Sequence, residues 1–133
     1  MIAFGLALAW RRWQVFAQVL IAVLASNGLA SLLKVLVGSK RPSDPALVPI
    51  PHSHSFPSGH AAMSFAAATV LSAWAPRAAP AFVVLAAAIS YSRLYVGVHY
   101  PLDVIGGAVI GVATALLLLA AVRRRSGQLP RAG

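Results

Sequence analysis

Cysteine is absent from this chain of 133 residues, and acidic side chains are nearly so, since Asp44 and Asp103 are the only two. The lack of cysteine excludes disulfide bonds and thiolate chemistry. Charged residues of both signs make up only 10% of the chain. Because a charge among apolar residues is costly, each one that interrupts an apolar run is expected to serve a purpose.

Apolar residues are what the chain has in abundance. They make up 59% of it, and the mean hydropathy of +0.80 is too high for an ordinary soluble domain. The net charge of +9 would suggest a nucleic-acid partner, but the lysines and arginines punctuate apolar runs rather than alternate with aromatics on one face. The composition therefore predicts a membrane protein that contacts membrane lipids and argues against nucleic-acid binding.

Several apolar runs approach the length that a bilayer requires. A hydrocarbon core about 30 Å thick needs roughly 20 helical residues. Residues 13–37, 57–75 and 102–122 meet this length, residues 80–95 are borderline, and residues 1–10 are too short to span. We therefore predict an all-α integral membrane helical bundle of about four transmembrane helices with a short N-terminal apolar stub.

Basic residues mark the two sides of the membrane. With four spans, one set falls on a single side: Arg11, Arg12, Arg77 and Arg123 to Arg125. The positive-inside rule makes that side the cytoplasm, so Lys34 and Arg41 lie on the outer, periplasmic face of the plasma (inner) membrane. A single transmembrane domain is expected over residues 1–125, followed by a polar, disordered tail at residues 126–133.

The stretch from Ser92 to Asp103 concentrates polar residues. Pro101 suits the first position of a helix, which puts Asp103 in the first helical turn. From there the carboxylate can reach back to His99. A lone histidine is more often structural, but a carboxylate that holds one imidazole nitrogen makes the other a better nucleophile or base.

A second helix start is expected at the sequence PSGH, residues 57–60. Free backbone N–H groups, the positive end of the helix dipole and the close approach that Gly59 permits make an anion site there, and His60 follows directly. Taken alone, basic residues at a helix end are usually membrane-edge anchors. Here three of them match the charge of a phosphoryl group and its transition state: Lys34, Arg41 and Arg93.

In order and spacing these residues resemble the three signature motifs of the type 2 phosphatidic acid phosphatase superfamily. The first motif, Lys-x6-Arg-Pro, is filled by Lys34, Arg41 and Pro42. The second is Pro57 to His60, and the third, Ser-Arg-x5-His-x3-Asp, is filled by Ser92, Arg93, His99 and Asp103. The resemblance covers roughly residues 30–105 and leaves no motif position empty.

The resemblance implies a helical membrane phosphatase that acts on lipid phosphates without a metal or other cofactor. It implies that His99 is the nucleophile that forms a phosphohistidine, that Asp103 orients it, and that His60 protonates the leaving oxygen and then activates water. The residues implied to hold the phosphoryl oxygens are Lys34, Arg41, Ser58, Gly59 and Arg93, with Ser92 a weaker candidate.

Three readings of the function stay open. The first is a phosphatase for a lipid phosphate of the phosphatidic acid or phosphatidylglycerol phosphate type. The second is a polyprenyl (undecaprenyl-type) diphosphate phosphatase that recycles a cell-envelope carrier lipid. The motifs do not separate it from the first, because they are expected to contact only phosphate. The third is a non-enzymatic membrane protein, against which the intact His60, His99 and Asp103 argue.

One departure from the family pattern concerns the spans. Membrane members usually have about six, with about two before the first motif, whereas here one predicted span and the stub precede Arg41. A minimal form, a truncated start and a second copy that supplies the missing packing are the alternatives. The opening apolar stretch comes before Arg11, whereas in a secretory signal the basic residues come first. We therefore expect this stretch to belong to the mature protein.

Two weaker signals complete the sequence. His52 and His54 are a poor metal site, because they are two apart in a loop with little acidic support. Gly107 and Gly111 form a GxxxG pattern, for which we expect a packing face within the protein or, as the alternative, a homodimer contact.

Overall fold

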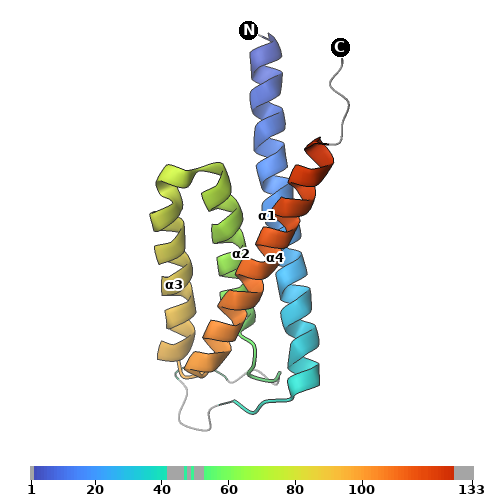
Figure 1. Ribbon diagram of the computed structural model, residues 1–133. Coiled ribbons are helices and arrows are strands. Elements are labelled where there is room, and N and C mark those ends of the chain that lie inside the picture. Colours follow the sequence, from blue (N-terminus) through green and yellow to red (C-terminus); the bar gives the residue numbers. More distant parts are fainter. Residues whose placement is uncertain (1, 42–46, 48, 50–52, 128–133) are drawn as a thin grey trace.

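Helices form all the regular structure in the part of the chain that the computed structural model describes, residues 2–41, 47, 49 and 53–127. The prediction of an all-α fold is confirmed. A 3₁₀ turn joins the second helix to the third. The helices in Figure 1 are α1 (Ile2–Val37), α2 (Gly59–Trp74), α3 (Ala79–Tyr95) and α4 (Pro101–Gly127).

Three of the helices are long and apolar enough to cross a membrane, over Arg11–Val37, Pro76–Tyr95 and Pro101–Arg125. The remaining helix, α2, has only 16 residues. That is a length of about 24 Å, which is less than the hydrocarbon core. The prediction of about four membrane helices thus corresponds to four helices, of which three have the length of a span.

The ends of the outer helices differ from the sequence prediction. The N-terminal stub is not a separate element, because α1 continues without a break from Ile2 through the first predicted span. Arginine is a good helix former, so the pair Arg11 and Arg12 interrupts the hydropathy but not the helix. At the other terminus α4 continues to Gly127, two residues into the predicted tail, and residues 128–133 lie outside the described part.

The short helix α2 occupies the centre of the bundle. It packs against α1, α3 and α4, whereas α3 and α4 have few contacts with each other. Alanines make this close packing feasible, and the buried core around Val70 contains Ala22 of α1, Ala66 of α2 and Ala115 of α4. The helix that begins at the PSGH motif is therefore held on three sides.

The glycines of α4 pack against α2. Gly107 and Gly111 are both buried. A Cβ atom added to Gly107 would collide with the carbonyl oxygen of Ser58, and one added to Gly111 would collide with that of Ala62. The GxxxG face is thus a contact within the chain. The expectation of a packing face within the protein is confirmed, whereas a homodimer contact stays a prediction that nothing here tests.

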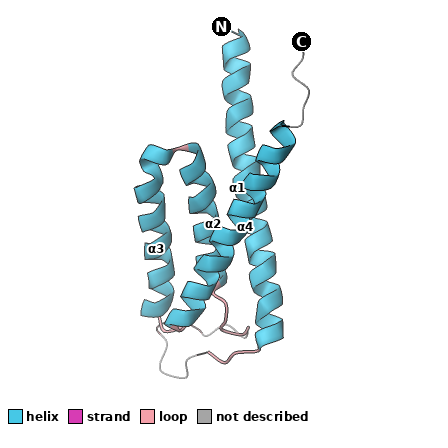
Figure 2. Ribbon diagram, in the orientation of Figure 1, coloured by secondary structure: helices cyan, strands magenta, loops and turns pink. Residues whose placement is uncertain are grey.

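The start of α1 and the motifs lie at opposite ends of the bundle. The start of α1 and the end of α4 are at the upper end in Figure 1, and the end of α1 and the starts of α2 and α4 are at the lower end. Figure 2 shows that the described residues just before α2 and just before α4 are loops that lead into the first turn of each helix. All three motifs therefore meet at one end of the helical bundle.

Candidate active site

The first motif is placed by the end of α1. Gly38 has a φ of 64°, a left-handed conformation that favours glycine. Its N–H bonds to the carbonyl oxygen of Lys34 at 3.0 Å, which closes the last helical turn. The turn leaves Lys34 half-buried at the end of α1 and directs the chain toward Arg41.

Arg41 is fixed by backbone and side-chain acceptors from two loops. Its Nε donates to the carbonyl oxygen of Ser53 at 2.8 Å and its Nη2 to the Oγ of the same residue at 3.0 Å. Its Nη1 donates to the carbonyl oxygen of Val98 at 2.7 Å. The planar guanidinium thus joins the loop before α2 to the loop before α4, and its position is set before any ligand arrives.

The second motif forms the start of α2. Ser58 is the N-cap, and its Oγ accepts from the N–H of Ala61 at 3.5 Å. The N–H of Ser58 donates to the carbonyl oxygen of Asp103 at 2.8 Å, which holds the start of α2 against the start of α4. Gly59 is the first helical residue and His60, which is exposed, is the second.

The third motif builds a histidine–carboxylate pair. Gly97, with a φ of 75°, turns the chain after α3 so that His99 comes directly before α4. The predicted contact is confirmed, since His99 Nδ1 lies 3.4 Å from Asp103 Oδ2 and both side chains are buried. The same carboxylate oxygen accepts from the N–H of Tyr100 at 2.7 Å. An acidic side chain in the first turn of a helix commonly reaches back to the N-cap in this way.

Ser55 is a third member of this group, and sequence reasoning missed it. Its side chain is fully buried. Its Oγ donates to Asp103 Oδ2 and lies 3.5 Å from His99 Nδ1. Asp103 Oδ2 is thus surrounded by a hydroxyl, a backbone N–H and an imidazole, which fixes the carboxylate and, through it, the ring of His99.

The two nitrogens of His99 have different surroundings. Nδ1 faces Asp103, and Nε2 lies 3.5 Å from Arg41 Nη1. Burial and the positive charge of Arg41 lower the pKa of His99 to about 4, although the Asp103 carboxylate opposes the change. Burial also lowers the pKa of Arg41, whose guanidinium nevertheless stays charged at neutral pH. The imidazole therefore keeps one nitrogen unprotonated until the pH falls to about 4.

A cavity of about 250 Å³ lies at this end of the bundle. The predicted residues that line it are Lys34, Arg41, Gly59, His60, Arg93 and His99. It combines three cations, two histidines and a helix N-terminus, and it can therefore hold a phosphate-sized anion beside His99 Nε2.

Two predicted phosphate ligands do not line the cavity. Ser58 is fully buried and turned toward Ala61 as the helix cap. The Oγ of Ser92 donates to the carbonyl oxygen of Ile89 at 2.7 Å and accepts from Arg93 Nε at 3.2 Å. In this arrangement Ser58 acts on the site by starting α2, and Ser92 acts by holding Arg93.

Four lining residues were not predicted: Asn27, Ser53, Met63 and Val98. Asn27 lies seven residues before Lys34 in α1, about two helical turns earlier on the same face. That spacing could have identified it. Nothing in the spacing of Ser53 or Val98 indicates that their carbonyl groups hold Arg41.

The weak metal signal is not tested by the structure. His52, like the motif residue Pro42, lies outside the described residues, and His54 is exposed. Among the residues that are described, no group of three histidine or acidic side chains could hold a metal ion.

Comparison with known proteins places these residues in a family context. The PAP2 superfamily model matches residues 2–126. The chain is 34% identical over 111 residues to a decaprenylphosphoryl-5-phosphoribose phosphatase of Mycobacterium tuberculosis, a match that covers 81% of this chain and 60% of that protein. The chain thus spans less than two thirds of the length of this relative.

Two solved structures have a similar fold. The crystal structure of Aquifex aeolicus LpxE matches with a TM-score of 0.76 and 33% identity, over 90% of this chain and 75% of that one. A transmembrane PAP2-type phosphatidylglycerolphosphate phosphatase from Bacillus subtilis matches with a TM-score of 0.66 and 26% identity, over 80% of this chain and 58% of that one. Both matches extend over most of this chain.

Proposed function

Because the chain belongs to the PAP2 superfamily, and is an integral membrane protein, we propose that it removes phosphate from a membrane lipid through a phosphohistidine intermediate. The observation that carries this proposal is the placement of His99. Its Nδ1 is held by Asp103, and its Nε2 lies beside Arg41 in a cavity that Lys34 and Arg93 also line.

The first half of the reaction is transfer to the protein. The cations hold the phosphoryl oxygens, and the lone pair of His99 Nε2 attacks phosphorus while the bond from phosphorus to the lipid oxygen breaks. His60, which lines the same cavity, donates a proton to the leaving oxygen, so the lipid departs as an alcohol. Asp103 stabilises the positive charge that develops on the imidazole.

The second half of the reaction is hydrolysis. His60, now neutral, takes a proton from water, and the resulting oxygen attacks the phosphorus of the phosphohistidine. The bond from phosphorus to Nε2 breaks, inorganic phosphate leaves, and the electron pair returns to His99. No atom besides those of the lipid, one water and the protein is needed.

We propose a lipid phosphate of the phosphatidic acid or phosphatidylglycerol phosphate type as the substrate. The name of the Bacillus subtilis structure supports this class. A polyprenyl phosphate or diphosphate is the second candidate, supported by the decaprenylphosphoryl group in the name of the mycobacterial relative. The residues that we assign to phosphate binding are expected to contact phosphate in either class of substrate.

Phosphate release from a lipid panel tests the function. We expect purified protein in detergent to hydrolyse phosphatidic acid or phosphatidylglycerol phosphate with the highest kcat/KM. Undecaprenyl diphosphate is the comparison substrate, and a preference for it by more than about tenfold would select the second candidate, since that is 1.4 kcal/mol of transition-state binding. Phosphate release from none of the lipids contradicts the proposal and favours a non-enzymatic protein.

We propose further that the site faces the outer, periplasmic side of the plasma membrane. Support comes from the arginines near the opposite end of the bundle, which the positive-inside rule assigns to the cytoplasm. Because the chain has no cysteine, single cysteines report sidedness directly. We expect an impermeant thiol reagent to label Lys40→Cys in intact cells and to label Ala75→Cys only after lysis, and the reverse pattern would place the site in the cytoplasm.

A further inference from the structure

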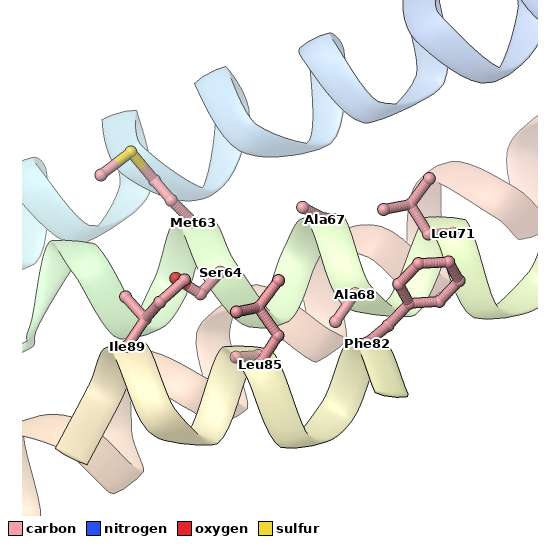
Figure 3. Close-up of a pocket in the computed structure, with 9 residues that line it drawn as sticks. Met63, Ser64, Ala67, Ala68, Leu71, Phe82, Leu85 and Ile89 are labelled. Atoms are coloured by element: carbon pink, nitrogen blue, oxygen red, sulfur yellow. The ribbon is translucent and has the colours of Figure 1, made fainter. Parts of the chain in front are cut away.

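An apolar groove begins where the active-site cavity ends. It has a volume of about 270 Å³ and lies between α2 and α3. Met63 lines both the groove and the cavity that contains His60 and His99. The other lining residues are Ser64, Ala67, Ala68 and Leu71 of α2 and Phe82, Leu85, Ala86 and Ile89 of α3 (Figure 3).

Both walls of the groove start at residues of the active site. On α2, His60 is followed one turn later by Met63, and the wall continues to Leu71, about 12 Å further along the helix. On the antiparallel α3, Arg93 is preceded one turn earlier by Ile89, and that wall continues back to Phe82. The groove therefore leads away from the site toward the opposite ends of α2 and α3.

The shape and chemistry of the groove suit a hydrocarbon chain. Figure 3 shows the larger side chains of α3 directed toward α2, where Ala67 and Ala68 leave space. Ser64 is the only lining residue with a polar side chain. Leu85 is 60% exposed and Ile89 is also exposed, so the groove is open to the bilayer at these residues and a lipid chain can enter sideways there.

We propose that this groove binds the hydrocarbon chain of the substrate while its phosphate occupies the active-site cavity. The inference rests on the proposed function. The occupant is the substrate's own chain, because this chain is attached to the oxygen that His60 protonates. Met63 and the rest of the groove follow His60 along α2, so the chain lies next to the groove. A chain seated there fixes the direction in which the leaving oxygen points.

The bilayer determines how such a groove contributes. Moving a chain from lipid to the groove gains little hydrophobic energy, because both surroundings are apolar. The benefit comes from packing and from orientation of the reacting oxygen. The groove should therefore affect the rate with long-chain substrates much more than the rate with short-chain ones.

Obstruction of the groove tests this. We expect Ala67→Phe to lower the ratio of kcat/KM for dioleoyl phosphatidic acid to that for dihexanoyl phosphatidic acid by about tenfold or more, because the larger side chain overfills the groove. Both lipids are presented at one mole fraction in mixed micelles. The matched control is Ala87→Phe, an exposed α3 position that does not line the groove and should leave the ratio unchanged.

A second obstruction guards against misfolding. Leu85→Trp alters the other wall at an exposed position and should lower the same ratio. Undecaprenyl diphosphate and its short farnesyl analogue form a parallel pair for a prenyl chain. If the wild type hydrolyses these lipids but both obstructed variants keep its ratio, the groove assignment is overturned while the function stands. Failure of the wild type on every lipid would instead overturn the function.

Discussion

Replacing His99 with alanine is expected to lower turnover by on the order of 10⁴-fold or more and to remove any trapped phosphoenzyme. The bond to phosphorus in our mechanism forms at Nε2, the ring nitrogen that faces Arg41 rather than Asp103. Phosphate release and alkaline quenching with radiolabelled substrate measure the two effects. Persistence of a phosphoenzyme in this variant would contradict the assignment.

Graded losses at the residues behind His99 sharpen this test. Asp103→Asn should cost about 10²- to 10⁴-fold, because the amide keeps the shape but not the charge that supports the imidazolium. Ser55→Ala should cost about tenfold, the loss of one charge-assisted hydrogen bond to that carboxylate. His54→Ala is the control, since this exposed residue contributes only its backbone carbonyl to the site.

His60→Ala is expected to separate two kinds of leaving group. Hydrolysis of a lipid monoester should fall by about 10²- to 10⁴-fold, because an alkoxide leaves poorly without a proton. Hydrolysis of an aryl phosphate such as p-nitrophenyl phosphate should lose much less in its first step, since its leaving group departs unprotonated. Parallel kcat/KM measurements on the two substrates provide the comparison.

The aryl substrate also reveals the second role of His60. Without a base to activate water, the phosphohistidine should break down slowly and accumulate during turnover. Equal losses on both substrates, with no accumulated intermediate, would make His60 a phosphate ligand and leave the acid unassigned. His54→Ala again serves as the histidine control.

The helices could be predicted because the signals that make them are local. The apolar runs and the proline that starts α4 at Pro101 are visible in the sequence. The continuation of α1 through the N-terminal stub could not be predicted in this way, because hydropathy falls at Arg11 while helix propensity stays high. The partner of the GxxxG face was also hidden, since it depends on how closely α2 approaches Gly107.

The site was predictable where chemistry follows spacing along one helix. The pairing of His99 with Asp103 follows from a first-turn carboxylate four residues after the histidine. Ser55 could not be found this way, because it reaches Asp103 across 48 positions of sequence and only the folded loop brings them together. Whether Ser58 caps α2 or contacts phosphate depends on the rotamer of its side chain. Its position in the motif alone therefore could not exclude a phosphate contact.

The packing of α2 on α4 has a consequence for the active site. The N–H of Ser58 holds the carbonyl of Asp103, and the bare glycine face locks the two helices together. Lys34 and Arg93 belong instead to α1 and α3, which both pack against α2. Because His99 directly precedes α4 and His60 is the second residue of α2, the α2–α4 contact also sets the distance between the two histidines of the site.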